Sequence, residues 1–286
     1  MKKQQAALLS VFSNTTLVIL KLVAGILMGS ISVLSEAIHS GIDLIASCVA
    51  YFSIKKANEP ADADHPYGHG KFENISGFFE AILIFVAAGI IIYEAVKKIL
   101  DPVAMVEKVD WGIAVMVISS IANIFISRTL FKIAKKENSI ALEADAMHLS
   151  IDVFTSLGVL LGLIVIKFTG IRILDPIIAL AVAALILKAS WDLTRRSLED
   201  LADKALPVDE LELIQKIFSQ YPEVKGSHRL RTRKCGKNRE IDIHVTVDGS
   251  MQVNAAHDLC NVLEREIKTQ LPETYVLIHV EPHGGA

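Results

Sequence analysis

The stretch SEAIHSGIDLIAS, from Ser35 to Ser47, places a histidine and an aspartate inside a run that otherwise has the composition of a membrane-embedded helix. His39 and Asp43 are four residues apart, so on a helix both side chains share one face, one turn from each other. A carboxylate at the centre of a bilayer costs about 3 kcal/mol on insertion scales, and ionisable groups at that depth usually have a function. The stretch therefore predicts a polar site inside a membrane.

The composition agrees with a membrane protein that also has a soluble part. The chain has 286 residues, of which 52% are hydrophobic, and its mean hydropathy is +0.44, too apolar for an ordinary soluble domain. The net charge of −3 and the absence of a basic cluster argue against nucleic acid as a partner. Cys48, Cys235 and Cys260 show no CxxC or pairing pattern, which predicts no disulfide framework and a reducing compartment for the soluble part.

Six segments are long and apolar enough to cross a lipid bilayer, which requires about 20 mostly apolar residues. They run approximately over residues 7–29, 31–54, 75–97, 110–133, 140–167 and 173–193. We interpret the first as a retained transmembrane helix rather than a signal peptide, because polar residues interrupt it and no clean cleavage motif follows. Lys and Arg are more frequent on the side of the N terminus, so we expect both termini in the cytoplasm.

The composition becomes polar after the sixth segment, which predicts two domains, 1–200 in the membrane and 201–286 in the cytoplasm. VDELELIQKIFSQY and NAAHDLCNVLEREIKTQL have helical spacing, whereas REIDIHVTVDG alternates as a strand and TYVLIHVEP reads as a last strand. The expected order is helix, strand, strand, helix, strand, which is a small α+β domain. A sheet with so few strands has exposed edges, so we expect this domain to associate with a second copy.

The spacing of the opening stretch recurs in ALEADAMHLSIDVF, where His148 and Asp152 are again four residues apart. If the two helices face each other, two imidazole nitrogens and two carboxylate oxygens meet. Zinc prefers four such ligands at about 2.0–2.2 Å. The alternatives are interhelical hydrogen bonds or a proton relay without metal, but the repetition of the pattern favours a metal.

The other histidines fall into two groups for which spacing alone leaves the role open. EPADADHPYGHGKFE places histidines beside a carboxylate in a loop, where such groups are either solvated or ligands: Asp62, His65 and His69. The C-terminal domain has a second group, either surface histidines or metal ligands: His228, His244, His257 and His279, with Glu281. Within this group His279 and Glu281 are two apart on a strand and therefore share a face.

With these residues assembled, the chain resembles a cation diffusion facilitator of the zinc-transporter type over nearly its whole length. The resemblance rests on six helices with HxxxD on the second and fifth, and on HPYGHGKFE, LADKALP, GSHRLRTR, IDIHVTV and VLIHVEP. It implies a homodimeric antiporter, not an enzyme, that exports divalent metal from the cytoplasm in exchange for protons. The resemblance also implies a location in the bacterial inner membrane. It implies a C-terminal domain with the metallochaperone-like, ferredoxin-like αββαβ fold. Zn²⁺ is then expected as both the transported substrate and a regulatory ligand.

The resemblance also implies roles for individual residues. The family's transport site matches His39, Asp43, His148 and Asp152. A loop site of some members matches Asp62, His65 and His69. The cytoplasmic dimetal site matches His228, His244, His257, His279 and Glu281, and a charge interlock of the dimer matches Lys71 and Asp203. Some bacterial relatives have Asp where this chain has His39 and accept cadmium as well as zinc, and a relative has Asp in place of Glu281.

Three classes of function remain to be separated. A transporter predicts saturable, proton-coupled flux of zinc or, alternatively, of iron(II) or cadmium. A channel needs weak binding at several sites, whereas strong N/O sites would trap zinc rather than pass it. A metal-binding membrane scaffold predicts binding without flux.

Overall fold

The computed structural model describes residues 2–28, 31–100, 110–169 and 173–284. The side chains of residues 28, 31–33, 35–36, 98, 110–116, 158–169 and 175 lie outside the description. The chain forms two compact units. The membrane unit comprises Met1–Pro60 and Lys71–Leu198, and the C-terminal unit comprises Ala61–Gly70 and Glu199–Ala286. The loop between the second and third helices thus packs with the C-terminal unit, a feature that the predicted division at residue 200 did not include.

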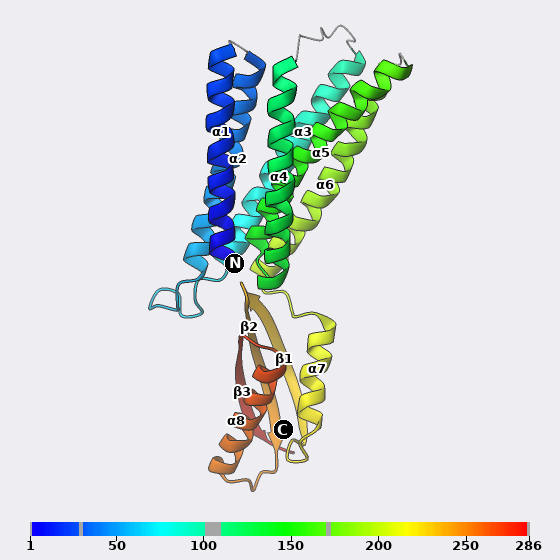
Figure 1. Ribbon diagram of the computed structural model, residues 1–286. Coiled ribbons are helices and arrows are strands. Elements are labelled where there is room, and N and C mark those ends of the chain that lie inside the picture. Colours follow the sequence, from blue (N-terminus) through cyan, green and yellow to red (C-terminus); the bar gives the residue numbers. More distant parts are fainter. Residues whose placement is uncertain (1, 29–30, 101–109, 170–172, 285–286) are drawn as a thin grey trace. The chain divides into compact units, whose positions relative to one another are not determined.

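In the described part of the chain, six long helices build the membrane unit, in agreement with the predicted six segments (Figure 1). Their bounds are α1 (Lys3–Met28), α2 (Ile31–Ala57), α3 (Phe72–Leu100), α4 (Asp110–Glu137), α5 (Ile140–Thr169) and α6 (Leu174–Leu201). Most helices extend a few residues beyond the predicted apolar spans. The helices are longer because their backbone hydrogen bonding continues into the charged residues at their ends. The predicted spans included only the residues that are apolar enough to lie in the hydrocarbon of a bilayer.

Five stretches among the described residues are long and apolar enough to cross a membrane. They are Lys3–Leu27, Ala37–Ala57, Phe72–Lys97, Val117–Glu137 and Pro176–Leu201. The predicted span 140–167 lies on α5, and its side chains from residue 158 onward lie outside the description. The architecture is that of an α-helical integral membrane protein.

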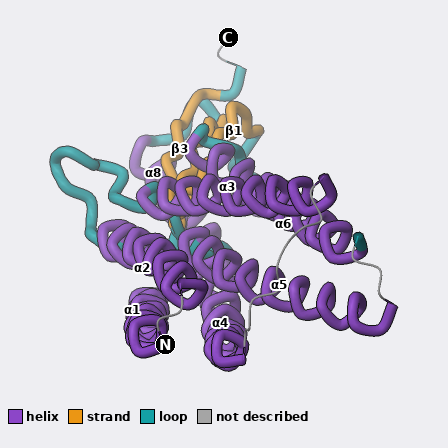
Figure 2. Tube along the Cα trace, turned by 90° about the horizontal axis from the view of Figure 1, so that it is seen from above, coloured by secondary structure: helices purple, strands orange, loops and turns teal. Residues whose placement is uncertain are grey.

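The helices of the membrane unit pack as hairpins around a central contact between α2 and α5. α1 packs on α2 and α4 packs on α5, while α3 contacts both α2 and α5. Figure 2 shows α3 and α6 alongside each other, and Ser190 of α6 donates a hydrogen bond of 2.7 Å to the carbonyl of Ala81 on α3. Ala81, Ala88 and Ala144 are fully or almost fully buried between helices, where small side chains allow close approach of backbones.

A buried ion pair joins three helices at the end of the membrane unit where α1, α3 and α5 begin. Lys3 of α1 forms an ion pair with Glu73 in the first turn of α3. Ser139 donates a hydrogen bond to the same carboxylate, and its oxygen accepts the backbone N–H of Leu142 at 3.4 Å. Because Ser139 precedes α5, it caps that helix while it holds Glu73 in place.

The C-terminal unit has the predicted order of elements. It contains α7 (Val208–Ser219), β1 (Gly226–Cys235), β2 (Asn238–Val247), α8 (Val253–Gln270) and β3 (Thr274–Pro282). The sheet has the order β1-β2-β3, with β1 antiparallel and β3 parallel to the central strand β2. The alternating apolar residues of β2 are buried against α7 and α8, whereas the opposite face carries polar side chains. The αββαβ fold is confirmed.

We predict that Glu210→Gln destabilises the C-terminal unit by about 1 kcal/mol at neutral pH. Glu210 of α7 accepts two hydrogen bonds from Arg239 of β2, at 2.7 and 2.9 Å, and these bonds lower the pKa of the carboxyl below its ordinary value of 4.5. The stabilisation is therefore complete above about pH 4.5 and is lost as the pH falls through the lowered folded pKa.

Hydrogen exchange of α7 and β2 in the full chain, measured between pH 4 and 7, tests this prediction. The matched control is Glu212→Gln, because Glu212 is exposed on the same helix. A destabilisation by Glu210→Gln no larger than that of the control at pH 7 contradicts it.

Candidate metal centres

The two HxxxD motifs face each other across the contact of α2 and α5. The four side chains of this membrane cluster are His39 and Asp43 on α2, and His148 and Asp152 on α5. His148 Nε2 lies 2.9 Å from Asp43 Oδ1, and His39 Nε2 lies 3.7 Å from Asp152 Oδ1. Each imidazole thus contacts the carboxylate of the opposite helix, so the two pairs cross the interface one turn apart.

The spacing of these atoms is close to what a tetrahedral zinc ion requires. Ligands at 2.0–2.2 Å from zinc stand about 3.3–3.6 Å from one another. One ligand atom each from His39, Asp43 and Asp152 lies within 4.8 Å of the other two, and His148 contacts Asp43 directly. Three of the four residues thus offer ligand atoms that lie together, and His148 adjoins them through its contact with Asp43.

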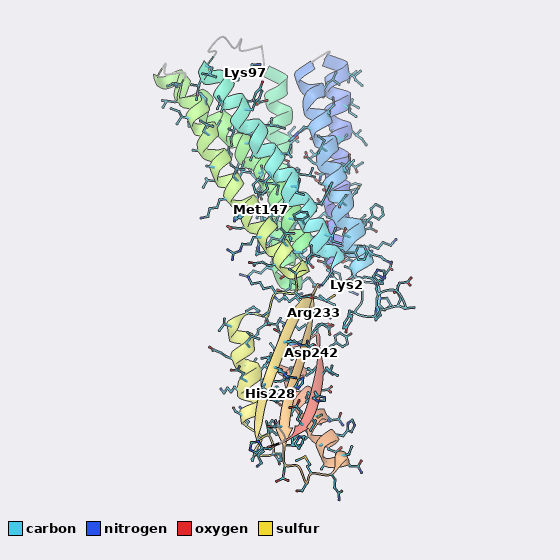
Figure 3. The ribbon with its side chains drawn as sticks, turned by 180° about the vertical axis from the view of Figure 1, so that it is seen from behind. Lys2, Lys97, Met147, His228, Arg233 and Asp242 are labelled. Carbon is cyan, nitrogen blue, oxygen red and sulfur yellow. The ribbon has the colours of Figure 1, made fainter. Side chains whose placement is uncertain are left out.

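The membrane cluster is buried on one side and open on the other. Asp43 and His148 are only 5% and 7% exposed, whereas the side chain of His39 is 52% exposed. Met147, the neighbour of His148, is labelled on α5 in Figure 3. His39 therefore lies at the accessible rim of the cluster, whereas Asp43 and His148 lie in its interior.

Polar residues of α1 and α4, which the sequence analysis did not single out, surround this cluster. The amide of Asn123 on α4 is 3.5 Å from Asp152 Oδ2. Ser47, one turn beyond Asp43, accepts a hydrogen bond of 2.6 Å from Asn14 of α1. The signal that could have revealed them is the one that revealed the histidines, namely a polar side chain in a helix long and apolar enough to span a bilayer.

The loop cluster consists of Asp62, His65 and His69, which the structure brings together within the C-terminal unit. Asp62 Oδ1 lies 3.4 Å from His65 Nδ1, and Asp62 Oδ2 lies 3.3 Å from His69 Nε2. The backbone N–H of His65 donates to Asp62 at 2.7 Å, and this bond is the main reason that the pKa of the Asp62 carboxyl is lowered. The loop thus holds an ionised carboxylate against two imidazoles.

The loop keeps this shape because it docks on the β1–β2 turn. At Gly70 a Cβ atom would lie 2.3 Å from the carbonyl oxygen of Cys235, so only glycine fits there. The thiol of Cys235 donates to the carbonyl of Tyr67 at 3.6 Å, and the guanidinium of Arg233 lies 4.6 Å from the centre of the Tyr67 ring. No sequence pattern had indicated these contacts.

The sheet cluster consists of His228, His244, His279 and Glu281 on the polar face of the sheet. His228 of β1, His244 of β2 and His279 of β3 are register partners, so they form one row across the three strands. Figure 3 labels His228 on β1. Glu281, two residues after His279, lies 2.7 Å from His244 Nδ1 and 3.2 Å from His228 Nε2.

The charge of Glu281 is stabilised by these neighbours. The hydrogen bond with His244 and the nearby imidazoles lower the pKa of the Glu281 carboxyl. Three imidazoles converging on an ionised carboxylate form a donor set that suits zinc. His257 is exposed on α8 and is not part of this group among the described residues.

The two residues of the predicted charge interlock belong to different units. Asp203, in the C-terminal unit, accepts a hydrogen bond of 3.2 Å from Arg233, and Lys71 belongs to the membrane unit. The pairing of Lys71 with Asp203 therefore stays a prediction.

Comparison with known proteins assigns both units. Residues 7–202 match the family model of the cation efflux transmembrane domain, and residues 206–283 match that of the cation efflux protein cytoplasmic domain. An uncharacterized transporter of Synechocystis is 37% identical over 96% of this chain and 89% of its own length. The cation-efflux pump FieF of Shewanella oneidensis is 32% identical over 96% of this chain and 92% of its own length.

Among solved structures, the metal-bound C-terminal domain of the CzcD transporter from Thermotoga maritima is 32% identical. The match covers 28% of this chain and 93% of that domain, with a TM-score of 0.27. Both family models together span almost the entire sequence. The chain therefore belongs to the cation diffusion facilitator family, whose members are cation-efflux transporters and not enzymes.

Proposed function

We propose that this protein is a proton-coupled antiporter that exports divalent cations, zinc first among them, from the cytoplasm by alternating access at the membrane cluster. The observation that carries the proposal is the crossing of the two His–Asp pairs between α2 and α5. The two nitrogen and two oxygen donors suit zinc better than magnesium or calcium, which prefer oxygen alone. Iron(II) and cadmium are the alternative substrates.

Competition between zinc and protons for the same atoms provides the coupling. Imidazole and carboxylate must be deprotonated to bind a metal, so zinc binding releases protons. An imidazole in water titrates at about pH 6.5, within reach of a physiological proton gradient. Where the proton concentration is higher, protons displace the metal from the same ligands. If the site is exposed alternately to the two sides of the membrane, protons entering the cell drive zinc outward.

The C-terminal unit would act as a zinc sensor in a homodimer. Zinc bound at the sheet cluster, alone or with the loop cluster, would favour the arrangement of protomers for which it has the higher affinity. The row of histidines and the exposed strand edges support this role, since a short three-stranded sheet gains from a partner. The orientation with both termini in the cytoplasm follows from the Lys and Arg distribution and belongs to the same proposal.

Zinc flux into vesicles tests the transport proposal. In vesicles reconstituted with the full chain and an imposed pH gradient, we expect saturable zinc uptake. Asp152→Ala should reduce it to the level of protein-free vesicles, because the site loses an oxygen ligand and its paired charge. Asp192→Ala, an exposed acid of α6, is the matched control and should retain uptake.

Each class of function gives a different result in that assay. Uptake that is independent of the pH gradient and does not saturate indicates a channel. Zinc binding without uptake indicates a scaffold. Normal uptake by Asp152→Ala removes this residue from the site.

The substrate preference should depend on His39. The family resemblance associates Asp at this position with cadmium transport, and a carboxylate can bind in a bidentate mode that suits a larger ion. We therefore expect His39→Asp to raise the ratio of cadmium to zinc flux several-fold in the same vesicles. An unchanged ratio, with zinc flux retained, would exclude His39 as a selectivity residue.

The sensor role predicts a zinc-dependent rearrangement of protomers. With the full chain in detergent and fluorophores on Cys260, energy transfer between protomers should change as zinc is added. His244→Ala should abolish the change, because His244 contacts Glu281 at the centre of the row. His283→Ala, an exposed histidine outside the cluster, is the control. A full response by His244→Ala would leave the sheet cluster with at most a structural role.

A further inference from the structure

The last turns of α4 carry exposed cations that the proposed transport mechanism does not use. Arg128, Lys132 and Lys135 are four and three residues apart, so their side chains share one face of the helix. Lys136 adjoins them, and we call these four residues the basic stripe. They are spread over nine positions of the sequence, and only the helix aligns them. The last ten residues of α4 contain one acid, Glu137, and therefore carry a net charge of +3.

The basic stripe continues an apolar stripe on the same face of α4. With 3.6 residues per turn, Ile118, Ile121 and Phe125 fall in line with Arg128. The three apolar residues are 59%, 50% and 69% exposed. They belong to Val117–Glu137, one of the stretches long and apolar enough to span a membrane. In a bilayer this face of α4 therefore contacts the acyl chains of lipids.

The opposite face of α4 packs inside the membrane unit. Asn123, Leu130 and Ala134 are buried there. Leu130 and Ala134 form one apolar cluster with Ala6 and Ala7 of α1, and Figure 2 shows α1 and α4 alongside each other. The basic stripe consequently faces away from the helices on which α4 packs.

The basic stripe has no partner within the part of the chain that the structure describes. All four cations are exposed, and none forms an ion pair with another described residue. Several cations of other helices at this end of the unit are instead neutralised by acids of the protein: Lys3 by Glu73, Lys56 by Glu59 and Arg196 by Glu143. The charge of the basic stripe is therefore free to attract an anion from outside the chain.

Two general effects account for only part of this arrangement. The helix macrodipole favours cations in the last turn, such as Lys135 and Lys136, but it acts only within that turn. Arg128 and Lys132 precede Glu137 by nine and five residues, so they lie outside its reach. The preference for Lys and Arg on the cytoplasmic side of a membrane explains their number but not their alignment on one face.

The position of the basic stripe along α4 matches the polar boundary of a bilayer. From Asp110, where the helix begins, to Arg128 the helix rises about 27 Å, at 1.5 Å per residue. The hydrocarbon core of a bilayer is about 30 Å thick, so Arg128 lies near its edge when α4 spans it. Lys132 lies about 6 Å further along the axis, within the headgroup layer.

We propose that the basic stripe binds the phosphate headgroup of an anionic phospholipid whose acyl chains lie along Ile118, Ile121 and Phe125. Arg and Lys donate charge-assisted hydrogen bonds to phosphate oxygens. Each cation close to an anionic lipid surface strengthens binding about fivefold. One lipid molecule thus satisfies both the unpaired charge and the exposed apolar face of α4. The proposal does not depend on the transport function.

Lipid binding to the purified full chain in detergent tests this inference. Native mass spectrometry, with phosphatidylglycerol as the anionic probe and phosphatidylcholine as the neutral one, gives the dissociation constant of each lipid. We expect the wild type to prefer phosphatidylglycerol by up to about a hundredfold, or about fivefold for each of the three aligned cations. The preference should decrease as the salt concentration rises, because salt screens the attraction.

Neutral substitutions locate the binding site. Arg128→Gln, Lys132→Gln and Lys135→Gln combined should abolish the preference for phosphatidylglycerol and leave phosphatidylcholine binding unaltered. Lys132→Gln alone should weaken phosphatidylglycerol binding about fivefold, and this single variant decides the matter if the triple variant does not insert. Lys55→Gln, an exposed cation of α2 at the same end, is its matched control and should bind as the wild type does.

Three outcomes overturn the inference. The first is a wild type without preference for the anionic lipid. The second is a preference that survives in Lys132→Gln, or that falls equally in Lys55→Gln, since the charge of this membrane end as a whole would then suffice. The third is displacement of phosphatidylglycerol by glycerol phosphate at equal concentration, which assigns the site to a soluble phosphate because acyl chains then contribute nothing.

Discussion

The crossed pairing of His39 with Asp152 and of His148 with Asp43 is the constraint on which the membrane unit depends. Inside a bilayer neither carboxylate can rely on water, so each needs a partner on another helix. Because each motif spans one helical turn, satisfying both pairs at once fixes the rotation of α2 and α5 and their relative height. The helices that flank this contact complete the polar surroundings through Asn14 of α1 and Asn123 of α4.

Polar contacts have this influence because the hydrophobic effect does not drive helices together within lipid. Hydrocarbon surrounds the exterior as favourably as another helix does, so packing of small residues and interhelical hydrogen bonds decide the arrangement. α3 illustrates both effects, since Ala81 and Ala88 allow close approach, while Glu73 at its first turn ties α1 and the start of α5 together.

The C-terminal unit reaches a metal-binding geometry by a different route. Its apolar β2 face packs on α7 and α8, which leaves the polar face free to align three histidines in one row. The alternation in REIDIHVTVDG was sufficient to predict which face His244 occupies. It contained no information on which residue of β1 or β3 stands opposite, since strand register depends on turns and on pairing between distant segments. The docking of the 61–70 loop on Cys235 was equally unpredictable, because it joins residues far apart in the chain.

Sequence periodicity by itself determined six apolar helices, an αββαβ tail, and the two HxxxD motifs, because these features depend on local spacing and on the cost of burying polar groups. Only the tertiary structure decided that the four side chains meet with each imidazole opposite the other helix's carboxylate. It also aligned the histidines of three different strands in one row, with Glu281 beside them. These juxtapositions depend on the rotation and register of whole elements, which long-range packing fixes and which no local pattern encodes.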